Sequence, residues 1–423
     1  MHERLLQFIW QFQYFDSRSL DTLEEEPLQI LDPGKRNRDQ GPDFTAAKIS
    51  IGNTVWSGNV EIHVLASDWY RHRHQHDPRY SNVILHVVWK YDLQTHNILT
   101  GIPTLELQPR VAGILLDRYE LLMHSTLFVP CEKSLPIIKP LLWVSWKERL
   151  LAERLCRKQD TIMLYLQQSN YHWEEIFWWL IARNFGMLVN ADAFEMIARS
   201  LPLKTLVRHK QQIHQLEALL FGQAGLLNNR FTESYPLLLQ REYKFYEKKY
   251  GLRQVTGSVK MLRMRPSSFP TVRLAQLAML IHTSGHLLSA VLEKDSLKEL
   301  TALLNVSAND YWHYHYRFEE AGDLKVKQVG SDMISNILIN TIVPFLFAYG
   351  NYHQEQTHVA KALRWLDELS PENNRITRGW AASGIRSKTA FDSQALLELK
   401  TKYCDYKRCL DCHVGNALLR CLS

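Results

Sequence analysis

The spacing of apolar residues changes near residue 130, and this change constrains the fold more than any other feature. Before it, apolar and polar residues alternate, as at Val60, Ile62 and Val64, which predicts β-strands. After about residue 140, apolar residues recur at every third or fourth position, which predicts amphipathic helices. A chain of 423 residues has room for two or three domains. We therefore expect an α+β protein with a mixed α/β domain at 1–130, a helical domain at 131–400 and a tail at 401–423.

Within the first domain, a helix is expected at the N-terminus, where Leu5, Ile9 and neighbouring apolar residues have helical spacing. Strands are expected at 44–52 and 54–65, and Gly52-Asn53 between them is typical of a tight hairpin turn. Two further strands are expected at 82–89 and 104–108.

The composition excludes several classes of protein. With 46% hydrophobic and 22% charged residues, the chain is neither disordered nor collagen-like, and its six cysteines are too few for a disulfide scaffold. Cys156 is expected to be an ordinary buried residue of a helix. The N-terminal residues lack the pattern of a signal peptide. The most apolar stretch, 333–350, contains Asn336, Asn340 and Pro344 and is short for a bilayer, so we expect a buried helix. A cytoplasmic protein with reduced thiols and no membrane partner is the resulting expectation.

One group of residues in the first domain has the chemistry of a metal site. Six of the 18 histidines lie between His63 and His96, and Asp43 precedes them at the start of a predicted strand. Glu61 and His63 are two residues apart on the next strand, so their side chains point to the same face of the sheet. Neighbouring strands are about 4.8 Å apart, which lets Asp43 reach that face as well. Two carboxylates and a nitrogen suit Mg²⁺ or Mn²⁺, and such an ion activates water for hydrolysis.

The order of the expected elements over residues 3–110 resembles the core of PD-(D/E)XK nucleases: helix, strand, strand, hairpin, strand, helix, strand. Pro42-Asp43 stands at the first acidic motif of that core and Glu61 at the second. The resemblance implies that Asp43 and Glu61 bind the metal ion. His63 stands where these nucleases have lysine, and a histidine can orient or deprotonate water or bind the metal itself. The implied catalytic residues are Asp43, Glu61 and His63.

A second resemblance covers nearly the whole chain. The segments NRDQGPDF, GNVEIHV, SDWYRHRHQHDPRYSNVILHVV, EALLFGQAGLL and CDYKRCLDCHVG are similar to those of a bacterial family described as a domain of unknown function. This resemblance indicates which segments belong together, and it implies no activity.

The loop that follows His63 adds further polar residues. On a helix, His72 and His76 would lie one turn apart, at the i, i+4 spacing of zinc sites, although Pro78 limits any helix there. The interspersed arginines alternatively indicate a loop that faces phosphate. His74 is expected to lie in a solvated loop. The residues expected to line the cleft are Asp68, His72, His76, Asp77 and His86.

An ordinary structural role stays open for each of these residues. Asp43 would then begin a turn, and Glu61 would pair with an arginine across the sheet. His63 and His86 would be strand residues bonded to the backbone. In that case the chain would be a non-catalytic nucleic-acid-binding or scaffold protein on a degenerate nuclease core.

Three cysteines near the C-terminus have the spacing of metal ligands. Cys404, Cys409 and Cys412 form a C-x4-C-x2-C pattern, in which thiolates two residues apart can bind one ion. Cys131, just after the α/β domain, is the expected fourth ligand, and Cys421 is an alternative. Four thiolates suit zinc or an iron–sulfur cluster.

The net charge of +6 is concentrated in one segment. Residues 241–273 contain nine Lys/Arg and two Glu, a local charge of +7, so the rest of the chain is close to neutral. Aromatic residues are interspersed among these cations, and such a mixture can bind phosphates and stack on unpaired bases. A solvated helix with inward-facing aromatic residues is the alternative. The residues expected to contact DNA or RNA are Lys248, Lys249, Arg263, Arg265 and Arg273.

The sequence contains no Walker loop, no dinucleotide-binding glycine motif and no GxSxG motif, which argues against ATP hydrolysis, nicotinamide chemistry and serine hydrolysis. The function that we expect is metal-dependent, nuclease-like hydrolysis of nucleic-acid phosphodiesters. Non-catalytic binding and hydrolysis of a small phosphorylated molecule are the alternatives.

Overall fold

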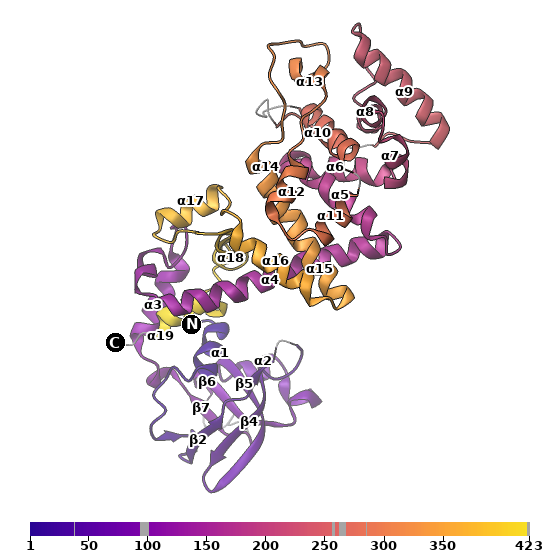
Figure 1. Cartoon of the computed structure of the whole chain (residues 1–423). Coiled ribbons are helices and arrows are strands. Elements are labelled where there is room, and N and C mark those ends of the chain that lie inside the picture. Colours follow the sequence, from indigo (N-terminus) through magenta and orange to yellow (C-terminus); the bar gives the residue numbers. More distant parts are fainter. Residues whose placement is uncertain (38, 94–100, 256–258, 262–267, 285, 421–423) are drawn as a thin grey trace. The chain divides into compact units, whose positions relative to one another are not determined.

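The computed structural model describes residues 1–423 except 38, 94–100, 256–258, 262–267, 285 and 421–423. The chain forms two compact units (Figure 1). The sheet unit comprises residues 1–144 and 400–423, and the helical unit comprises residues 145–399. The predicted α+β class is confirmed, since a mixed sheet near the N-terminus is followed by a large helical part. The boundary expected at residue 130 falls inside the sheet unit, which also includes the C-terminal tail.

A mixed seven-stranded sheet forms the centre of the sheet unit. Its strands are β1 (Leu20–Asp21), β2 (Pro27–Asp32), β3 (Lys35–Arg36), β4 (Phe44–Ile51), β5 (Thr54–Leu65), β6 (Val83–Lys90) and β7 (Thr104–Glu106). The order is β1-β2-β4-β5-β6-β7, and β3 pairs with β4 beside this path. Pairing is antiparallel up to β5, whereas β5, β6 and β7 run parallel.

The hairpin predicted at Gly52-Asn53 joins β4 to β5. Gly52 has a φ of +57°, which a glycine adopts without strain, and the flanking residues Ile51 and Thr54 are paired. At the other end of β4, the register shifts between Phe44 and Ala47, so both of these side chains are buried. This bulge places the chain before Phe44 against the middle of β5.

The expected N-terminal helix is α1 (Glu3–Gln11). Its residues Leu6, Ile9 and Trp10 are fully buried in one core with the side chains of the sheet. Because β5 and β6 are parallel, the chain must cross over between them. It does so through α2 (Asp68–Arg71) and the short turns η1 (His74–His76) and η2 (Pro78–Tyr80).

The C-terminal segment belongs to the sheet unit. After β7 the chain forms η4 (Gln108–Arg110), α3 (Gly113–His124) and η5 (Glu132–Ile137), and the tail forms η8 (Leu399–Cys404), η9 (Cys409–Asp411) and α19 (His413–Arg420). The Tyr14 hydroxyl donates a hydrogen bond to Asn416 Oδ1 at 2.8 Å. An ion pair of 3.2 Å joins Arg4 to Asp411. Both contacts attach the tail to the N-terminal residues.

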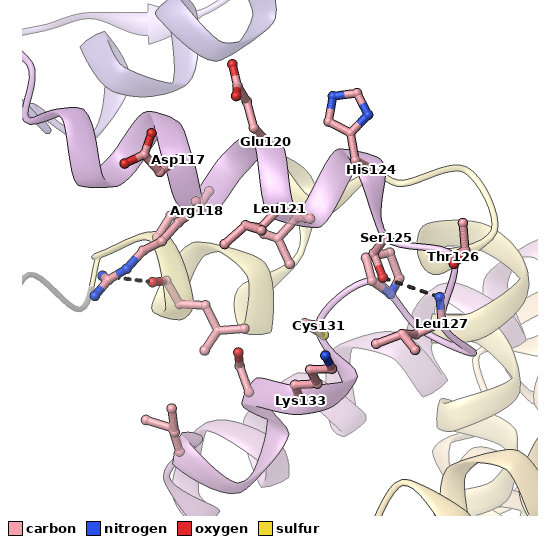
Figure 2. A pocket seen from close by; sticks show the side chains of 16 residues that line it. Asp117, Arg118, Glu120, Leu121, His124, Ser125, Thr126, Leu127, Cys131 and Lys133 are labelled. Carbon is pink, nitrogen blue, oxygen red and sulfur yellow. Dashed lines mark hydrogen bonds between the residues drawn. The ribbon is translucent and has the colours of Figure 1, made fainter.

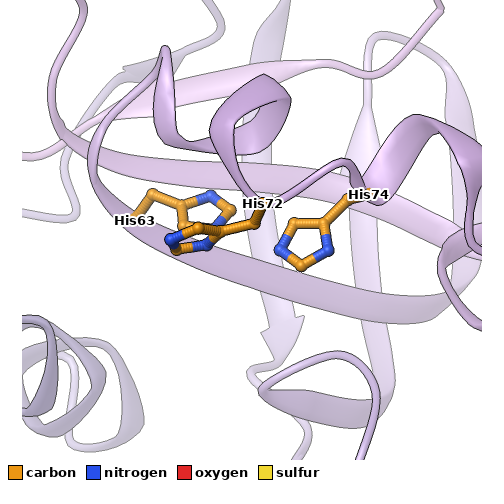
Figure 3. Close-up of side chains that lie close together, drawn as sticks. All are labelled: His63, His72 and His74. Atoms are coloured by element: carbon orange, nitrogen blue, oxygen red, sulfur yellow. The ribbon is translucent and has the colours of Figure 1, made fainter.

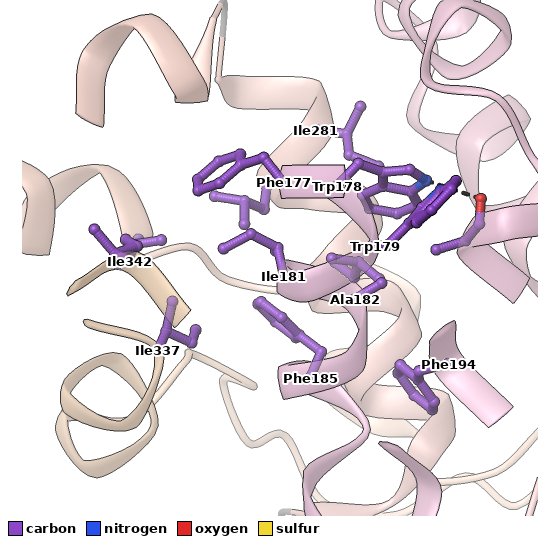
Figure 4. Close-up of a cluster of buried hydrophobic side chains, with 14 of the residues drawn as sticks. Phe177, Trp178, Trp179, Ile181, Ala182, Phe185, Phe194, Ile281, Ile337 and Ile342 are labelled. Atoms are coloured by element: carbon purple, nitrogen blue, oxygen red, sulfur yellow. Dashed lines mark hydrogen bonds between the residues drawn. The ribbon is translucent and has the colours of Figure 1, made fainter. Parts of the chain in front are cut away.

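The helical unit is built around one large apolar core, part of which Figure 4 shows. Phe177, Trp178 and Phe185 of one helix lie at its centre. The helices are α4 (Pro140–Gln168), α5 (Trp173–Phe185), α6 (Met187–Ser200), α7 (Leu203–His209), α8 (Ile213–Gln223), α9 (Ser234–Tyr250), α10 (Pro270–Thr283), α11 (Leu287–Glu293), α12 (Leu297–Leu304), α13 (Asp310–Tyr314), α14 (Ser331–Ile337), the π-helix η7 (Leu338–Ile342), α15 (Val343–His353), α16 (Gln356–Glu368), α17 (Arg375–Ala382) and α18 (Ala390–Glu398).

The most apolar stretch of the sequence forms one continuous helical segment, Ser331–His353. By length and composition it is long and apolar enough to cross a membrane. However, 72% of its most apolar window is buried inside the protein, as expected for a helix of a hydrophobic core. Ile337, Ile342 and Phe345 are fully buried there.

The prediction that Cys156 is buried was wrong. This residue is exposed on α4, whereas its neighbour Leu155 is 3% exposed. Successive residues of a helix point about 100° apart, so the residue after a buried position can face solvent. The apolar character of cysteine alone did not identify the buried face.

Candidate metal centre

Asp43 and Glu61 are neighbours at the point where β4 begins. Phe44 pairs with Val60, so Asp43 lies across from Glu61. The Asp43 backbone N–H donates to Glu61 Oε2 at 3.1 Å, and Ile62 N–H donates to Asp43 Oδ2 at 3.2 Å. Glu61 is only 5% exposed. The two carboxyl groups identified from the sequence are therefore held side by side and largely away from solvent.

His63 lies at the centre of a group of histidines (Figure 3). Its Nδ1 is 2.9 Å from Nε2 of His86 on the parallel strand β6, and its Nε2 is 3.2 Å from Nδ1 of His72. One nitrogen from each of His63, His72 and His74 lies within 4.8 Å of the others, a grouping that could hold a metal ion. His63 is buried, His74 is half-buried and His72 is exposed, so the group is open to solvent on one side.

The backbone at Arg73 decides which loop histidines join this group. Helix α2 ends before His72, and Arg73 then adopts a left-handed conformation with φ of +60°. The reversal brings His74 back beside His72, whereas His76 is exposed in η1. The expectation that His74 is a solvated loop residue was therefore wrong. The alternative of His72 and His76 one turn apart on a helix does not occur, because the helix stops too early.

Glu61 contacts two members of the histidine group. Its Oε1 lies 3.5 Å from His63 Nε2 and 3.4 Å from His74 Nε2. The His74 Nε2 atom is buried and has no hydrogen-bond partner in the described part of the chain. Buried polar atoms normally have a partner, so an unpaired nitrogen beside a carboxyl group is a place where a cation would fit.

Burial shifts the pKa of each of these groups toward the uncharged form. Desolvation, together with Asp43, raises the pKa of Glu61 to about 9, and desolvation raises the pKa of Asp43 to about 7. Burial and the neighbouring histidines lower the pKa of His63 to about 2, and burial lowers that of His86 to about 3. Neutral imidazole is the form that binds metals, and a bound cation would displace the protons of the carboxyl groups.

Two residues of α1 complete the site, and the sequence analysis missed both. Gln7 Nε2 donates to Asp43 Oδ1 at 2.8 Å and to Glu3 Oε1 at 3.3 Å, while Gln7 Oε1 accepts from Arg36 at 2.9 Å. The charge of Glu3 contributes to the raised pKa of both Asp43 and Glu61. The sequence contains one signal of this role, since Gln7 is a polar residue on an otherwise apolar helix face. In the structure Gln7 is only 8% exposed.

The acidic residues of the loop stabilise its backbone. Asp68 is 4% exposed; its Oδ2 accepts from Leu65 N–H at 3.2 Å, and it forms an ion pair of 2.7 Å with Arg71. Asp77 accepts from the Arg79 N–H at 3.0 Å, which caps η2. Asp68 thus fixes the start of α2, and Asp77 fixes the turn that leads to β6.

A pocket of about 520 Å³ opens beside the histidine group. His74 lies on its wall and stacks on Tyr80, with ring centroids 3.8 Å apart. His76 and Asp77 line the same pocket, together with Trp69. Its volume is within the range of small-molecule sites.

A larger cavity of about 850 Å³ is lined by α3 and residues 125–137 (Figure 2). Leu418 and Leu419 of α19 close one side, where Arg118 donates to the Leu418 carbonyl at 3.4 Å. Of the site residues predicted from the sequence, Cys131 contributes to this cavity. Of Asp43, Glu61 and the three grouped histidines, His74 lines the smaller pocket and none lines the larger cavity, so we place the candidate chemistry beside the smaller pocket.

The structural alternatives that the sequence left open do not match these contacts. In the described part of the chain, no arginine pairs with Glu61, whose partners are Asp43, His63 and His74. The side chains of His63 and His86 bond to each other and not to the backbone of the described residues. Asp43 leads directly into β4 and accepts from the neighbouring strand.

The cysteines expected to bind metal all lie in the sheet unit. Cys409 and Cys412, each 7% exposed, flank η9, and the Cys412 N–H donates to the Cys409 carbonyl at 3.3 Å. Cys131 lies near enough to Cys404 to raise the pKa of that thiol, after burial and Cys412. Cys421 lies outside the described residues.

The basic segment has one exposed helix face. Lys248 and Lys249 are exposed in the last turn of α9, and Phe245 beside them is 58% exposed. Tyr243 and Tyr246 point inward, at 3% exposed each. The helix therefore combines a cationic surface with aromatic residues that belong mostly to the core.

Of the three arginines predicted to contact nucleic acid, the structure describes Arg273, which gives no such surface. Arg273 is 7% exposed within α10 and donates to Gln276 Oε1 at 2.9 Å. Its predicted contact with nucleic acid does not fit this buried position, which follows from the apolar neighbours of α10 on all sides. Arg263 and Arg265 lie outside the described residues.

Comparison with known proteins identifies one family. Neither the curated proteins nor the solved structures gave a match to the chain. The model of the family "Protein of unknown function (DUF2851)" matches residues 3–375, which include the sheet, the histidine group and most of the helical unit. The chain belongs to this family.

Proposed function

We propose that the protein is a metal-dependent hydrolase that cleaves phosphodiester bonds of nucleic acids at the histidine–carboxyl site. The observation that carries this proposal is the grouping of His63, His72 and His74 nitrogens within 4.8 Å, with Glu61 3.4–3.5 Å from two of them. Three imidazoles with an open side are typical of catalytic metal sites, which keep a position for water or substrate.

The donor atoms change the metal that we expect. A pair of carboxylates predicted Mg²⁺ or Mn²⁺, whereas three imidazoles suit zinc and related transition metals better. His63 then serves as a ligand, with Glu61 as the adjacent acid–base group. Such an ion, when bound, lowers the pKa of water and stabilises charge that develops on a phosphate.

The residues around the ion would hold the substrate and move protons. Burial and Asp43 raise the pKa of Glu61, and a cation beside it would lower that pKa again, so that Glu61 becomes a proton acceptor. Gln7 orients Asp43 through a 2.8 Å hydrogen bond. Arg73 is exposed on the adjoining loop and would supply positive charge for a phosphate, whereas Arg71 and Arg79 pair with Asp68 and Asp77.

The order of elements supports a nuclease-like site. The PD motif and the ExH motif lie on the two strands of one hairpin, and the second strand is followed by a crossover to a parallel strand, as in the core that the sequence resembles. The cationic face of α9 suits a polymeric anion. A small phosphorylated molecule is the second candidate, because the pocket of about 520 Å³ has the size of a small-molecule site.

The experiment is a cleavage assay on end-labelled single- and double-stranded DNA and RNA, with Zn²⁺, Mn²⁺ and Mg²⁺ in separate reactions. We expect cleavage in at least one metal, and loss of cleavage in Glu61→Gln and His63→Ala. Salt-sensitive binding that survives these substitutions, without cleavage in any metal, would instead identify a non-catalytic binding protein. Activity on small phosphoesters alone would select the second candidate.

His76→Ala is the matched control. His76 has the same side chain, lies on the same loop as His74 and is outside the ligand group. Because His76 lines the adjoining pocket, metal binding is the property compared: equal losses of bound metal in His74→Ala and His76→Ala would indicate damage to the loop and not removal of a ligand.

A further inference from the structure

Three separate segments of the sheet unit bring cysteines together. Cys131 precedes η5, Cys404 ends η8, and Cys409 and Cys412 flank η9. Cys131, Cys404 and Cys409 form no disulfide. Cys131 and Cys409 pack in the same hydrophobic core, although 278 positions separate them in the sequence. We propose that these four cysteines bind one thiophilic metal centre, a zinc ion or an iron–sulfur cluster, which attaches the tail to the sheet unit.

The four thiols lie near enough to one another for their charges to interact. After burial, Cys412 and Cys409 raise the pKa of Cys131, and Cys412 raises that of Cys409. Burial and the other three cysteines raise the pKa of Cys404. These contacts join all four side chains into one group, as a centre with four thiolate ligands requires.

The backbone around η9 brings Cys409 and Cys412 into one tight turn. Lys407 adopts a left-handed φ of +49°, and the chain then turns so that Cys412 N–H bonds to the Cys409 carbonyl. A Cβ atom at Gly415 would overlap the Cys409 carbonyl group, so the close approach of α19 to this turn requires glycine. Lys400 and Lys407 lower the pKa of Cys404 and Cys409 respectively, which offsets part of the charge of four thiolates.

The distances between the sulfur atoms distinguish a single zinc ion from an iron–sulfur cluster. Zinc–sulfur bonds of about 2.3 Å place the sulfurs of a tetrahedral site about 3.8 Å apart. Among the described residues, the histidine group is the one whose ligand atoms all lie within 4.8 Å, so the cysteine sulfurs are more widely spread. A zinc ion would draw the side chains inward, whereas a cluster of several irons accepts a wider spacing.

The test combines metal analysis of the purified full-length protein with alkylation of its thiols. We expect either about one zinc per cysteine site, or iron and sulfide with visible absorption. Cys131, Cys404, Cys409 and Cys412 are expected to be protected from alkylation until a chelator is added, while exposed Cys156 reacts at once. Alkylation of all five at similar rates, after reconstitution with zinc and separately with iron and sulfide, would overturn the proposal.

Single Cys→Ser substitutions complete the experiment. Cys131→Ser and Cys412→Ser are expected to lose the bound metal, and Cys156→Ser is expected to keep it. His74→Ala separates this site from the histidine group, because it leaves all thiols in place. Retention of metal by both Cys131→Ser and Cys412→Ser, with unprotected thiols in the parent protein, would contradict a four-cysteine centre.

Discussion

His63 is the residue that connects all parts of the candidate site. Its two ring nitrogens face different neighbours, His86 Nε2 at 2.9 Å and His72 Nδ1 at 3.2 Å. Because only one nitrogen of a neutral imidazole carries a proton, the hydrogen bond with His86 fixes which nitrogen of His63 is left to bind a metal. His86, a buried residue of β6, thereby determines which nitrogen of His63 faces the candidate metal site.

We predict that His74→Ala weakens binding of Zn²⁺ or Mn²⁺ by at least about 100-fold, because loss of even an outer-shell partner of a metal site typically costs about 10–100-fold. Isothermal titration calorimetry checks the affinity, with His76→Ala as control. Equal affinities in the two variants would exclude His74 as a ligand.

Sequence reasoning located Asp43, Glu61 and His63 because strand periodicity and a two-residue hairpin determine which side chains share a face. It misassigned His74 because the decisive feature is a positive φ at Arg73, a residue type that rarely adopts one. Nothing in the local sequence signals that conformation.

A second buried carboxyl group lies in the helical unit. Glu217 on α8 is 0% exposed, and its Oε2 accepts from the Tyr235 hydroxyl at 2.8 Å and from Trp312 Nε1 at 3.0 Å. Its Oε1 is buried without a hydrogen-bond partner in the described part of the chain. Burial raises the pKa of Glu217 from 4.5 to about 7, in spite of both hydrogen bonds.

This pKa predicts a pH dependence of stability. The pKa of Glu217 is higher in the folded than in the unfolded protein, so its contribution to the free energy of unfolding is fully present below pH 4.5 and is lost as the pH rises through 7. The free energy of unfolding falls by about 3 kcal/mol, because each unit of pKa difference corresponds to about 1.4 kcal/mol. Urea unfolding between pH 4.5 and 8 is expected to show this decline in the wild type relative to Glu217→Gln. Parallel pH profiles of the two proteins would contradict a raised pKa at this position.

Among the elements, α8 and α9 illustrate how closely the helical unit is packed. Gly222 on α8 faces the ring of Tyr243 on α9, and a Cβ atom at Gly222 would overlap that ring. The aromatic residues of α9 that the sequence associated with nucleic acid are divided by this packing: Tyr243 is part of the core, and Phe245 faces solvent.

We predict that Gly222→Ala destabilises the protein by about 1–3 kcal/mol, the usual cost of overpacking a core. Gly113→Ala is the control, since Gly113 begins a helix and has open space around its Cα. Chemical denaturation of both variants measures the difference. A stability of Gly222→Ala equal to that of Gly113→Ala would show that α9 can move away from α8 at little cost.

Elements with strong local signals were predictable, among them α1, the hairpin and the strands that flank it. The crossover between β5 and β6 was not, because its short turns depend on Asp68 and Asp77 contacts with nearby backbone groups. Likewise, the role of Gln7 on α1 depends on its hydrogen bond to Asp43, which lies 36 positions later in the sequence.

At the scale of the whole molecule, the sheet unit contains both ends of the chain. Tyr14 bonds to Asn416, Arg4 pairs with Asp411, and Leu419 is fully buried in the core of the sheet unit. Contacts between residues some 400 positions apart leave no local pattern in the sequence. The sequence therefore predicted residues 401–423 as a separate tail.

Deletion of residues 405–423 is therefore expected to destabilise the sheet unit and leave the helical unit intact. Hydrogen–deuterium exchange should become faster in β4, β5 and β6 and remain unchanged in α5 and α8. Unchanged protection of the sheet would mean that the tail contributes little to its stability.

The central claim is that His63, His72 and His74 bind one metal ion beside Glu61. X-ray absorption of the zinc-loaded protein tests it most directly, in a variant in which Cys131, Cys404, Cys409 and Cys412 are all replaced by serine, so that the proposed cysteine centre contributes no sulfur. We predict imidazole ligands at about 2.0–2.1 Å and one or two oxygens in the first coordination shell. A shell of oxygens alone, or no stoichiometric binding, would contradict the account.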